Sequence, residues 1–398
     1  MTSAYRWAIL AVAMAAFIQT HLHRMAFAPL IPTFVADLGL TYAATGTIQT
    51  AYFWTYTAAQ IPIGILADRW GSRRVMLASM AVLVAGALAF AASGSYLESI
   101  GARMLVGLGA AAVWVPSMRL VMEWFPPHER GRVTGLLSAG GGAGGTLGLI
   151  LVPWLATVWG WRWAYGASAL PALASLVLLA LLLPAGRGGG APGGAGPGSL
   201  RRVLATRAVW PLNLTVLLSY GGWFGFLTFL PAFLVTSLDV SRAQAGLLTS
   251  LITAGTIVSW PVAGFLSDRL GRRKPVFLVS QAASALACLV FAVGLPHLGV
   301  GGAAAAAVAT GLLVGGMITP FTMIVELFPP ALAGTAAGVT NAASFVGGMI
   351  FPIVLGRIVD LTGGFTAAYL LAGALQGLAL LSALFVRETG AGRYTASR

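Results

Sequence analysis

The sequence contains GILADRWGSRR at residues 64–74 and repeats it 200 residues later as GFLSDRLGRRK at residues 264–274. Each copy ends one long apolar run and precedes the next. An acid followed by several Arg residues suits a tight turn between two membrane helices, and the basic cluster favours the cytoplasmic side. Gly64 and Gly264 would let neighbouring backbones approach closely. The repeat therefore predicts a duplicated bundle of membrane helices.

The composition is that of a protein dissolved in lipid. Hydrophobic residues make up 58% and charged residues 8% of the 398 residues, and the mean hydropathy is +0.88. A soluble domain carries about 25% charged residues. Apolar runs of about 20 residues, the length that crosses a bilayer core, recur along the whole chain. The first run is long and contains His and Arg, so we do not expect a removable signal peptide.

The net charge of +13 could indicate a nucleic-acid-binding protein, but the positions of the basic residues argue against it. Most of the 23 Lys and Arg residues fall in loops or tails on the side shared by Asp68 and Asp268. This positive-inside bias predicts a multi-pass protein of the cytoplasmic (inner) membrane with both termini in the cytoplasm. No nucleic-acid partner is expected.

The apolar runs predict an all-α membrane protein with twelve transmembrane helices in two pseudo-symmetric six-helix bundles. Residues 1–183 form the expected N-terminal bundle, the Gly/Pro-rich segment 184–207 a cytoplasmic linker, and residues 208–398 the C-terminal bundle. In this architecture a substrate site forms near the bilayer midplane. The expected spans are 6–31, 43–67, 75–95, 97–124, 132–157, 162–183, 208–236, 243–267, 275–295, 300–328, 334–359 and 365–386.

Motifs of catalysis and cofactor binding are missing from the sequence. Cys288 is the only cysteine, which excludes an intrachain disulfide and a Cys-based metal site. We find no His/Glu metal spacing, no nucleophile elbow and no phosphate loop with Lys. An enzyme is therefore the least expected class, no cofactor or metal is expected, and ATP is not the expected energy source.

Charged side chains inside the spans point to function, because each costs at least about 2.5–3.5 kcal/mol at the bilayer centre. The first span carries His21, His23 and Arg24. We interpret Arg24, with His21 beside it, as a ligand for an anion; an Arg that snorkels to the outer interface is the alternative. The fourth span carries Arg119 one turn before Glu123. Arg119 is a second candidate anion ligand, with an internal pair to Glu123 as the alternative.

Polar and aromatic side chains on other spans are candidates to line the same cavity. Gln49 and Tyr52 share one helical face of the second span, and lipid would not select Gln there. Tyr220, Trp223 and Asn341 could contact a substrate from the second half, although polar residues also join helices to one another. The glycines at residues 140–148 favour helix packing over substrate contact.

Three groups are candidates for carrying a coupling proton. They are His23, Glu123 and Glu326. Glu326 closes the tenth span in the segment ELFPP, which matches EWFPP from Glu123. A desolvated carboxyl group near the membrane end could bind and release a proton. An exposed cytoplasmic helix end is the alternative for Glu326.

The repeated turn resembles the loop signature of the major facilitator superfamily, Gly-x-Leu-Ala-Asp-Arg-x-Gly-Arg-Arg, which recurs in each half of that family. The first copy departs from the signature at Ser72, where the family usually has a basic residue, and the second copy has Arg272 at that position. The resemblance implies that the two turns act as cytoplasmic latches whose contacts break when the halves rock. The implied latch residues are Gly64, Asp68, Arg69, Gly264, Asp268 and Arg269.

The region from His23 to Arg74 resembles the anion:cation symporter and organophosphate antiporter branches of this superfamily. In those branches the Arg of helix 1 binds the anionic substrate, which implies that role for Arg24. Arg103 matches a family Arg in the pattern Arg-x-x-x-Gly-x-Gly, and we favour a structural or coupling role for it. The matching segments are RMAFAPLIP at 24–32, DLGLT at 37–41, QIPIGILADR at 60–69 and PSMRLVMEWFP at 116–126.

Three departures from the family patterns narrow the expected substrate. His23 stands where sugar-acid symporters often have Asp. The seventh span lacks the second Arg of the organophosphate branch, and the fifth lacks the Gly-Pro signature of drug/proton antiporters. Organophosphate exchange and drug export are therefore less favoured than carboxylate transport.

We therefore expect a secondary active transporter of a small organic anion, such as a monocarboxylate, dicarboxylate or sugar acid. It would work as a monomer by alternating access, with protons as the expected coupling ion. A multidrug/proton exporter is the alternative transporter. A receptor on the same fold that binds its ligand without transporting it is the third hypothesis.

Overall fold

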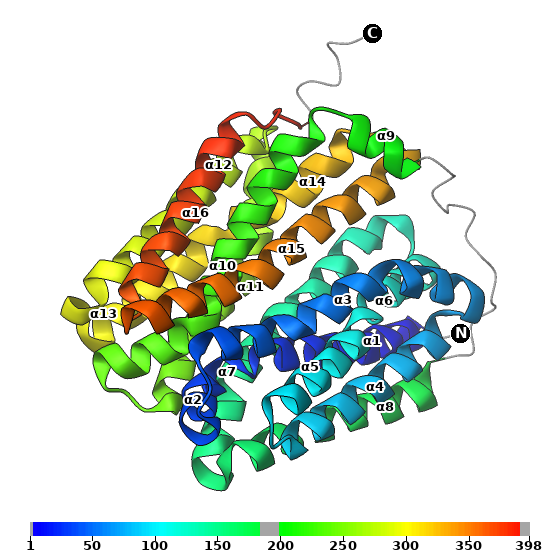
Figure 1. Cartoon of the computed structure of the whole chain (residues 1–398). Helices are drawn as coiled ribbons and strands as arrows, with labels where there is room; N and C mark the ends of the chain where they lie inside the picture. Colours follow the sequence, from blue (N-terminus) through cyan, green and yellow to red (C-terminus); the bar gives the residue numbers. More distant parts are fainter. Residues whose placement is uncertain (1–2, 184–198, 391–398) are drawn as a thin grey trace. The chain divides into compact units, whose positions relative to one another are not determined.

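The computed structural model describes residues 3–183 and 199–390, and residues 1–2, 184–198 and 391–398 lie outside the described part. In the described ranges all regular structure is helical, with no strand (Figure 1). Most of the predicted linker, 184–207, falls outside the described residues. Its end forms a short helix, α9 (Ser199–Ala205).

The helices of the N-terminal half follow the predicted spans with three interruptions. The first span is broken after Met25, just before Pro29, and the fourth is broken after Ala111. The fifth and sixth spans share a helix that is bent at Gly160, where φ is 79° and ψ is 159°. The elements are α1 (Ser3–Met25), η1 (Ala28–Leu30), α2 (Ile31–Leu38), α3 (Tyr42–Trp70), α4 (Ser72–Ala92), α5 (Tyr96–Ala111), α6 (Trp114–Trp124), α7 (Pro127–Ala167) and α8 (Ala169–Leu182).

The C-terminal half repeats this plan. Its tenth span is broken by the 3-10 turn η3, as the fourth span is broken between α5 and α6. The elements after α9 are α10 (Val209–Leu238), α11 (Arg242–Leu270), α12 (Lys274–Leu289), η2 (Val290–Gly294), α13 (Leu295–Leu313), η3 (Val314–Ile318), α14 (Thr319–Glu326), α15 (Pro330–Thr362) and α16 (Thr366–Leu384).

The chain divides into two compact units. The first contains α1 to α8 together with residues 240–253, and the second contains α9, α10 and the chain from residue 254 through α16. In the first unit α1 packs along α7, and α4 packs along α8 (Figure 1). The equivalent pairs of the second unit, α10 with α15 and α12 with α16, pack in the same way. The helix pairing therefore repeats the duplication seen in the sequence.

The described helices accommodate every predicted span. Nine of them, within the described residues, are long and apolar enough to cross a membrane. One of the nine, Leu136–Leu182, covers two predicted spans across the bend at Gly160. The first two predicted spans lie on α1 and α3, which are not among the nine.

The repeated turn has the tight geometry that its glycines suggest. Gly71 and Gly271 have φ angles of 81° and 61°, in the left-handed region that favours glycine. The expected close backbone approach at Gly264 is not met within the described residues, because a Cβ there would meet none of their atoms within 4 Å. Gly64 lies among the residues whose surroundings are not described.

Glycines hold the first and fifth spans of each unit together. A Cβ added to Gly144 of α7 would overlap the carbonyl oxygen of Ile18 on α1. Gly347 of α15 has the same relation to the carbonyl oxygen of Leu217 on α10. The packing role predicted for residues 140–148 is confirmed, and both units use the same small-residue contact.

We expect Gly144→Ala to destabilise the protein by about 1–3 kcal/mol, because the added methyl group cannot fit against the Ile18 carbonyl. Gly145→Ala is the matched control, since its Cβ would lie 3.6 Å from Cγ of Met25, an ordinary contact. Thermal unfolding of the detergent-solubilised variants, followed by size-exclusion chromatography, measures the difference. Equal melting midpoints for the two variants would contradict the packing described for α1 and α7.

Candidate functional site

Arg24 lies in the last turn of α1 and has an exposed fraction of only 8%. Its guanidinium carbon lies 5.1 Å from the ring centre of Tyr56, 5.4 Å from that of Tyr52 and 5.9 Å from that of Phe53, all on α3. Its Nε donates to the Tyr52 hydroxyl at 3.4 Å. The aromatic faces stabilise the cation inside the bundle. This position does not fit an Arg that snorkels to the membrane interface.

His21 lies on α1, one turn before Arg24, and is half-buried. Nη1 of Arg24 lies 3.4 Å from Nε2 of His21, and Nδ1 of His21 lies 3.3 Å from the carbonyl oxygen of Phe17. A guanidinium can only donate hydrogen bonds, so Nε2 must accept this one. The pattern fits a neutral imidazole that carries its proton on Nδ1.

Side chains from two other helices complete the end of α1. The last carbonyl groups of a helix have no intrahelical partner and need one elsewhere. Nη1 of Arg103 donates to the carbonyl oxygen of His23 at 2.7 Å, and Nε2 of Gln49 donates to that of Arg24 at 3.3 Å. Nη2 of Arg103 also donates to Oε1 of Gln49 at 3.0 Å. The backbone that carries Arg24 is therefore held by α3 and α5.

Arg103 is fully buried and brings a second cation close to Arg24. Its guanidinium carbon lies 5.2 Å from the ring centre of Tyr52, so this ring is shared by both guanidinium groups. Nη1 of Arg103 also donates to the Tyr165 hydroxyl at 3.3 Å. These contacts agree with the structural role favoured for Arg103.

His23 is fully buried, and both nitrogens of its ring have neighbours. Nδ1 lies 2.9 Å from the carbonyl oxygen of Gln19, and Nε2 lies 3.2 Å from Oγ of Ser168. The ring packs edge-on against Tyr165, with ring centres 5.8 Å apart. His23, a candidate for carrying the coupling proton, therefore lies where α1 meets α7 and the start of α8.

Together, His21, Arg24, Gln49, Tyr52 and Arg103 form the Arg24–Arg103 cluster. Its two guanidinium groups place positive charge in the interior of the first unit. All acceptors described for Arg103 are neutral carbonyl, amide or hydroxyl oxygens. Among the described residues, no acid pairs with Arg103, and a buried cationic site of this kind attracts anions.

Four further candidates of the first unit lie on α3 and α6, and the side chains of three of them are not described. Arg119 is on α6, and Asp68 and Arg69 are in the last turns of α3, but their side chains are outside the described set. The roles predicted for them stay predictions. Glu123, on α6, is exposed.

The candidates of the second unit make contacts within that unit. The hydroxyl of Tyr220 donates to the carbonyl oxygen of Met317 in η3 at 3.2 Å. Trp223 is buried and stacks on Phe226, with ring centres 5.6 Å apart. Asn341 is half-buried on α15. Substrate contact by Tyr220, Trp223 and Asn341 stays a prediction.

Charged side chains tie the repeated turn of the second unit to the ends of its helices. Arg273 forms ion pairs with Asp268 and with Glu326, whose Oε1 lies 2.9 Å from Nη2. Partial burial disfavours the charged form of Arg273, but hydrogen bonds to Glu326 and Asp268 outweigh it and raise its pKa. Glu388 accepts hydrogen bonds from the backbone N–H groups of Arg273 and Lys274 at 2.9 and 3.0 Å.

This network places Glu326 beside a cation at the end of α14. Its side chain is 27% exposed. Arg269 is exposed, and Gly264 is half-buried on α11. Glu326 therefore lies in the same charged network as Asp268, one of the implied latch residues.

Sequence reasoning missed several residues that the structure brings into polar networks. Tyr165 contacts Arg103 of the Arg24–Arg103 cluster and Ser168 contacts His23, but an aromatic and a small residue near a span end carry no distinctive signal. Gln281 and Gln376 are different, because the argument used for Gln49 applies to any amide in an apolar span. Nε2 of Gln281 donates to Oε1 of Gln376 at 3.2 Å, and Oγ of Ser219 donates to Oε1 of Gln281 at 2.7 Å.

A duplicated helical membrane bundle with a buried cationic cluster defines the architecture of a membrane transporter. The sequence model of the Major Facilitator Superfamily matches residues 9–236 and again residues 212–397. The chain belongs to the major facilitator superfamily. Membership confirms the predicted fold class, and because this is a family of transporters it also confirms that the chain is not an enzyme.

Several relatives are similar over most of the chain. The "Probable sulfoacetate transporter" of Cupriavidus necator is 24% identical over 96% of this chain and 94% of its own length. The "Probable nitrate/nitrite transporter" of Mycobacterium tuberculosis is 28% identical over 83% of this chain and 84% of its own. The "Probable galactarate/D-glucarate transporter" of Escherichia coli is 24% identical over 87% and 86%.

Solved structures agree on the fold. A crystal structure of a bacterial homologue of the human lysosomal transporter Spinster superimposes with a TM-score of 0.74. The match covers 97% of this chain and 95% of that one at 18% identity.

We expect Arg103→Gln to lower the melting midpoint strongly, because the His23 carbonyl and the Gln49 side chain would lose a buried donor, at about 1–3 kcal/mol for each unsatisfied group. Tyr165→Phe removes one weaker partner and should cost less. The control is Arg162→Gln, which changes an exposed Arg. If Arg103→Gln and Arg162→Gln have the same melting midpoint, Arg103 does not hold the end of α1.

Proposed function

We propose that this protein is a secondary active transporter of a small organic anion, such as a monocarboxylate, dicarboxylate or sugar acid, and that it is coupled to protons. The observation that carries the proposal is the buried Arg24–Arg103 cluster. Two guanidinium groups share the Tyr52 ring, and the partners of Arg103 are neutral. A carboxylate beside Arg24 would form a charge-assisted hydrogen bond with its guanidinium group.

The relatives support an anion as the cargo. Their names give sulfoacetate, nitrate or nitrite, and galactarate or D-glucarate as what they carry. Two of these three cargoes are organic acids. In our proposal Arg24 binds the anionic group, Arg119 supplies a second cation, and Tyr52 and Gln49 orient the site.

We propose His21 as the group that couples a proton to the anion. It lies 3.4 Å from Arg24 and is half-buried. Its Nε2 accepts a hydrogen bond from Arg24, so this nitrogen would take up a proton when a bound anion draws the guanidinium of Arg24 away. An imidazolium beside a bound carboxylate would add a favourable charge pair. The surroundings of the other three candidates favour this role less. His23 is enclosed by Gln19 and Ser168, Glu326 is paired with Arg273, and Glu123 is exposed.

Alternating access is the proposed mechanism. The two repeated turns would act as latches, with Asp68 and Arg69 in one and Asp268 and Arg269 in the other. The ion pairs of Arg273 with Asp268 and Glu326 support a latch role for the second turn. We further propose a monomer in the cytoplasmic membrane with both termini in the cytoplasm, as the distribution of Lys and Arg indicates.

The first test is uptake of labelled carboxylates into proteoliposomes, with and without an inward proton gradient. We expect wild-type protein to accumulate one of the acids and Arg24→Gln to lose roughly 10–100-fold in uptake, the value of a hydrogen bond to a charged group. Arg162→Gln is the charge-matched control and should transport normally, because Arg162 is exposed and its described contacts are the Ser93 carbonyl and the Trp161 ring, outside the cluster.

The alternatives predict different outcomes of the same assay. A multidrug exporter would move lipophilic cations and keep binding them in Arg24→Gln. A receptor would bind an acid without flux in either direction. Either result would overturn the anion-transport proposal.

The proton-coupling role has a separate test in His21→Gln. We expect this variant to keep anion exchange at equal concentrations on both sides, because Arg24 is intact, but to lose accumulation driven by a proton gradient. Comparing exchange with net uptake in the same vesicles separates binding from coupling. Accumulation that survives in His21→Gln assigns the proton to another group.

A further inference from the structure

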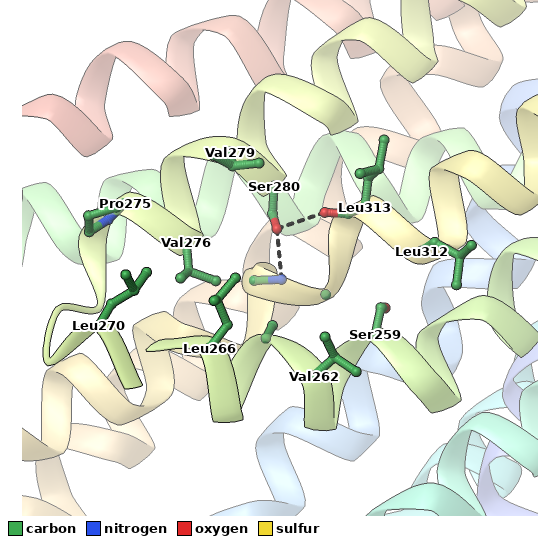
Figure 2. A pocket seen from close by; sticks show the side chains of 13 residues that line it. Ser259, Val262, Leu266, Leu270, Pro275, Val276, Val279, Ser280, Leu312 and Leu313 are labelled. Carbon is green, nitrogen blue, oxygen red and sulfur yellow. Dashed lines mark hydrogen bonds between the residues drawn. The ribbon is translucent and has the colours of Figure 1, made fainter. Parts of the chain in front are cut away.

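A lipid-facing groove crosses the second unit between α11 and α12 and ends at η3 (Figure 2). Its volume is about 240 Å³. Apolar side chains of α11 and α12 form its two walls, and the glycines of η3 form its floor. We call it the α11–α12 groove; its principal residues are Val262, Leu266, Leu270, Val279, Leu313 and Gly316.

The polar atoms in the walls already have partners within the protein. Oγ of Ser280 donates to the carbonyl oxygen of Leu313 at 2.8 Å and accepts from the N–H of Gly316 at 2.7 Å (Figure 2). Oγ of Ser259 donates to the carbonyl oxygen of Gly311 at 2.8 Å. The groove therefore offers apolar surface and suits a hydrocarbon chain rather than a polar ligand.

The groove opens to the side on which side chains face lipid. Val279 is 62% exposed and Leu270 and Leu313 are each 51% exposed. Along α11 the lining runs from Ser259 to Leu270, which is about 16 Å at 1.5 Å per residue. This is about half of a 30 Å hydrocarbon core. The groove thus has the length of one acyl chain in one leaflet.

The mouth of the groove is basic. Leu270 and Pro275 line its end, and the turn between them contains Arg272, Arg273 and Lys274, with Arg269 just before it. Nearby acids are already engaged: Asp268 and Glu326 bind Arg273, and Glu388 binds Arg272. Nζ of Lys274 donates to the carbonyl oxygen of Leu384, a neutral partner, and Arg269 is exposed. Within the part of the chain that the structure describes, no acid side chain forms an ion pair with Lys274 or Arg269.

We propose that the α11–α12 groove binds one anionic glycerophospholipid, with an acyl chain in the groove and the phosphate at Arg269 and Lys274. The acyl chain of such a lipid matches the length and apolar walls of the groove, and its anionic headgroup matches the basic mouth. The acyl chain would lie against Gly315 and Gly316 of η3. The bound lipid would therefore pack against the turn that interrupts the tenth span.

The site can be mapped with phosphatidylglycerol that carries a diazirine in one acyl chain, using the full-length protein in nanodiscs. Photocrosslinks should fall on peptides containing Val262–Val279 and Leu312–Gly316. Val279→Trp fills the groove and should remove most of this crosslinking. Val258→Trp is the matched control, because Val258 is 56% exposed on α11 but does not line the groove.

Competition with unlabelled lipids tests the headgroup. Phosphatidylglycerol should compete about thirtyfold better than phosphatidylcholine, at about 1 kcal/mol for each of the two basic residues, and Lys274→Gln should reduce that preference to about fivefold. Arg357→Gln removes an exposed charge elsewhere in the unit and should leave it unchanged. Equal competition by the two lipids in the wild type, or equal crosslinking of Val279→Trp and Val258→Trp, would overturn the proposal.

Discussion

The first unit depends on the hydrogen bonds that the buried guanidinium group of Arg103 donates. A charged group inside the membrane is tolerated only when protein atoms replace its water, and Arg103 obtains that replacement from α1, α3 and α7. The same hydrogen bonds satisfy the carbonyl of His23 at the end of α1. One residue therefore both allows α1 to end inside the membrane and holds three helices together. Arg24 projects from the turn that this contact fixes.

In the Arg24–Arg103 cluster, the charged side chains are hydrogen-bonded to the backbone that ends α1. Gln49 accepts a hydrogen bond from Arg103 and donates one to the backbone of Arg24. Tyr52 contacts both guanidinium groups. A ligand that moves Arg24 would act directly on the end of α1, because the two share this network. Such a link between a binding group and a helix end is what coupling of binding to conformational change requires.

The two units share the same glycine packing contact but differ in the charge of their buried polar networks. Gly144 and Gly347 make the same contact with the first helix of their units. The buried polar network of the second unit is made of neutral groups, Gln281, Gln376 and Ser219. The ion pairs described in that unit lie at the helix ends instead, at Arg272 and Arg273. Packing tolerates little change in volume, whereas a polar position can change its charge without moving the backbone.

The sequence by itself determined the membrane class, the duplicated plan of spans and the family, and it singled out Arg24 as a charge within a span. These follow from hydrophobic run length, a repeated turn and the high cost of charge in lipid, all of which act locally along the chain. Only the tertiary structure decided that Arg103 and Gln49 complete α1, that Glu326 pairs with Arg273, and that Gly264 makes no close contact. Those outcomes depend on which side chains from distant segments meet, and spacing within one helix carries no information about its neighbours. Partners of buried polar groups are therefore set by packing between helices.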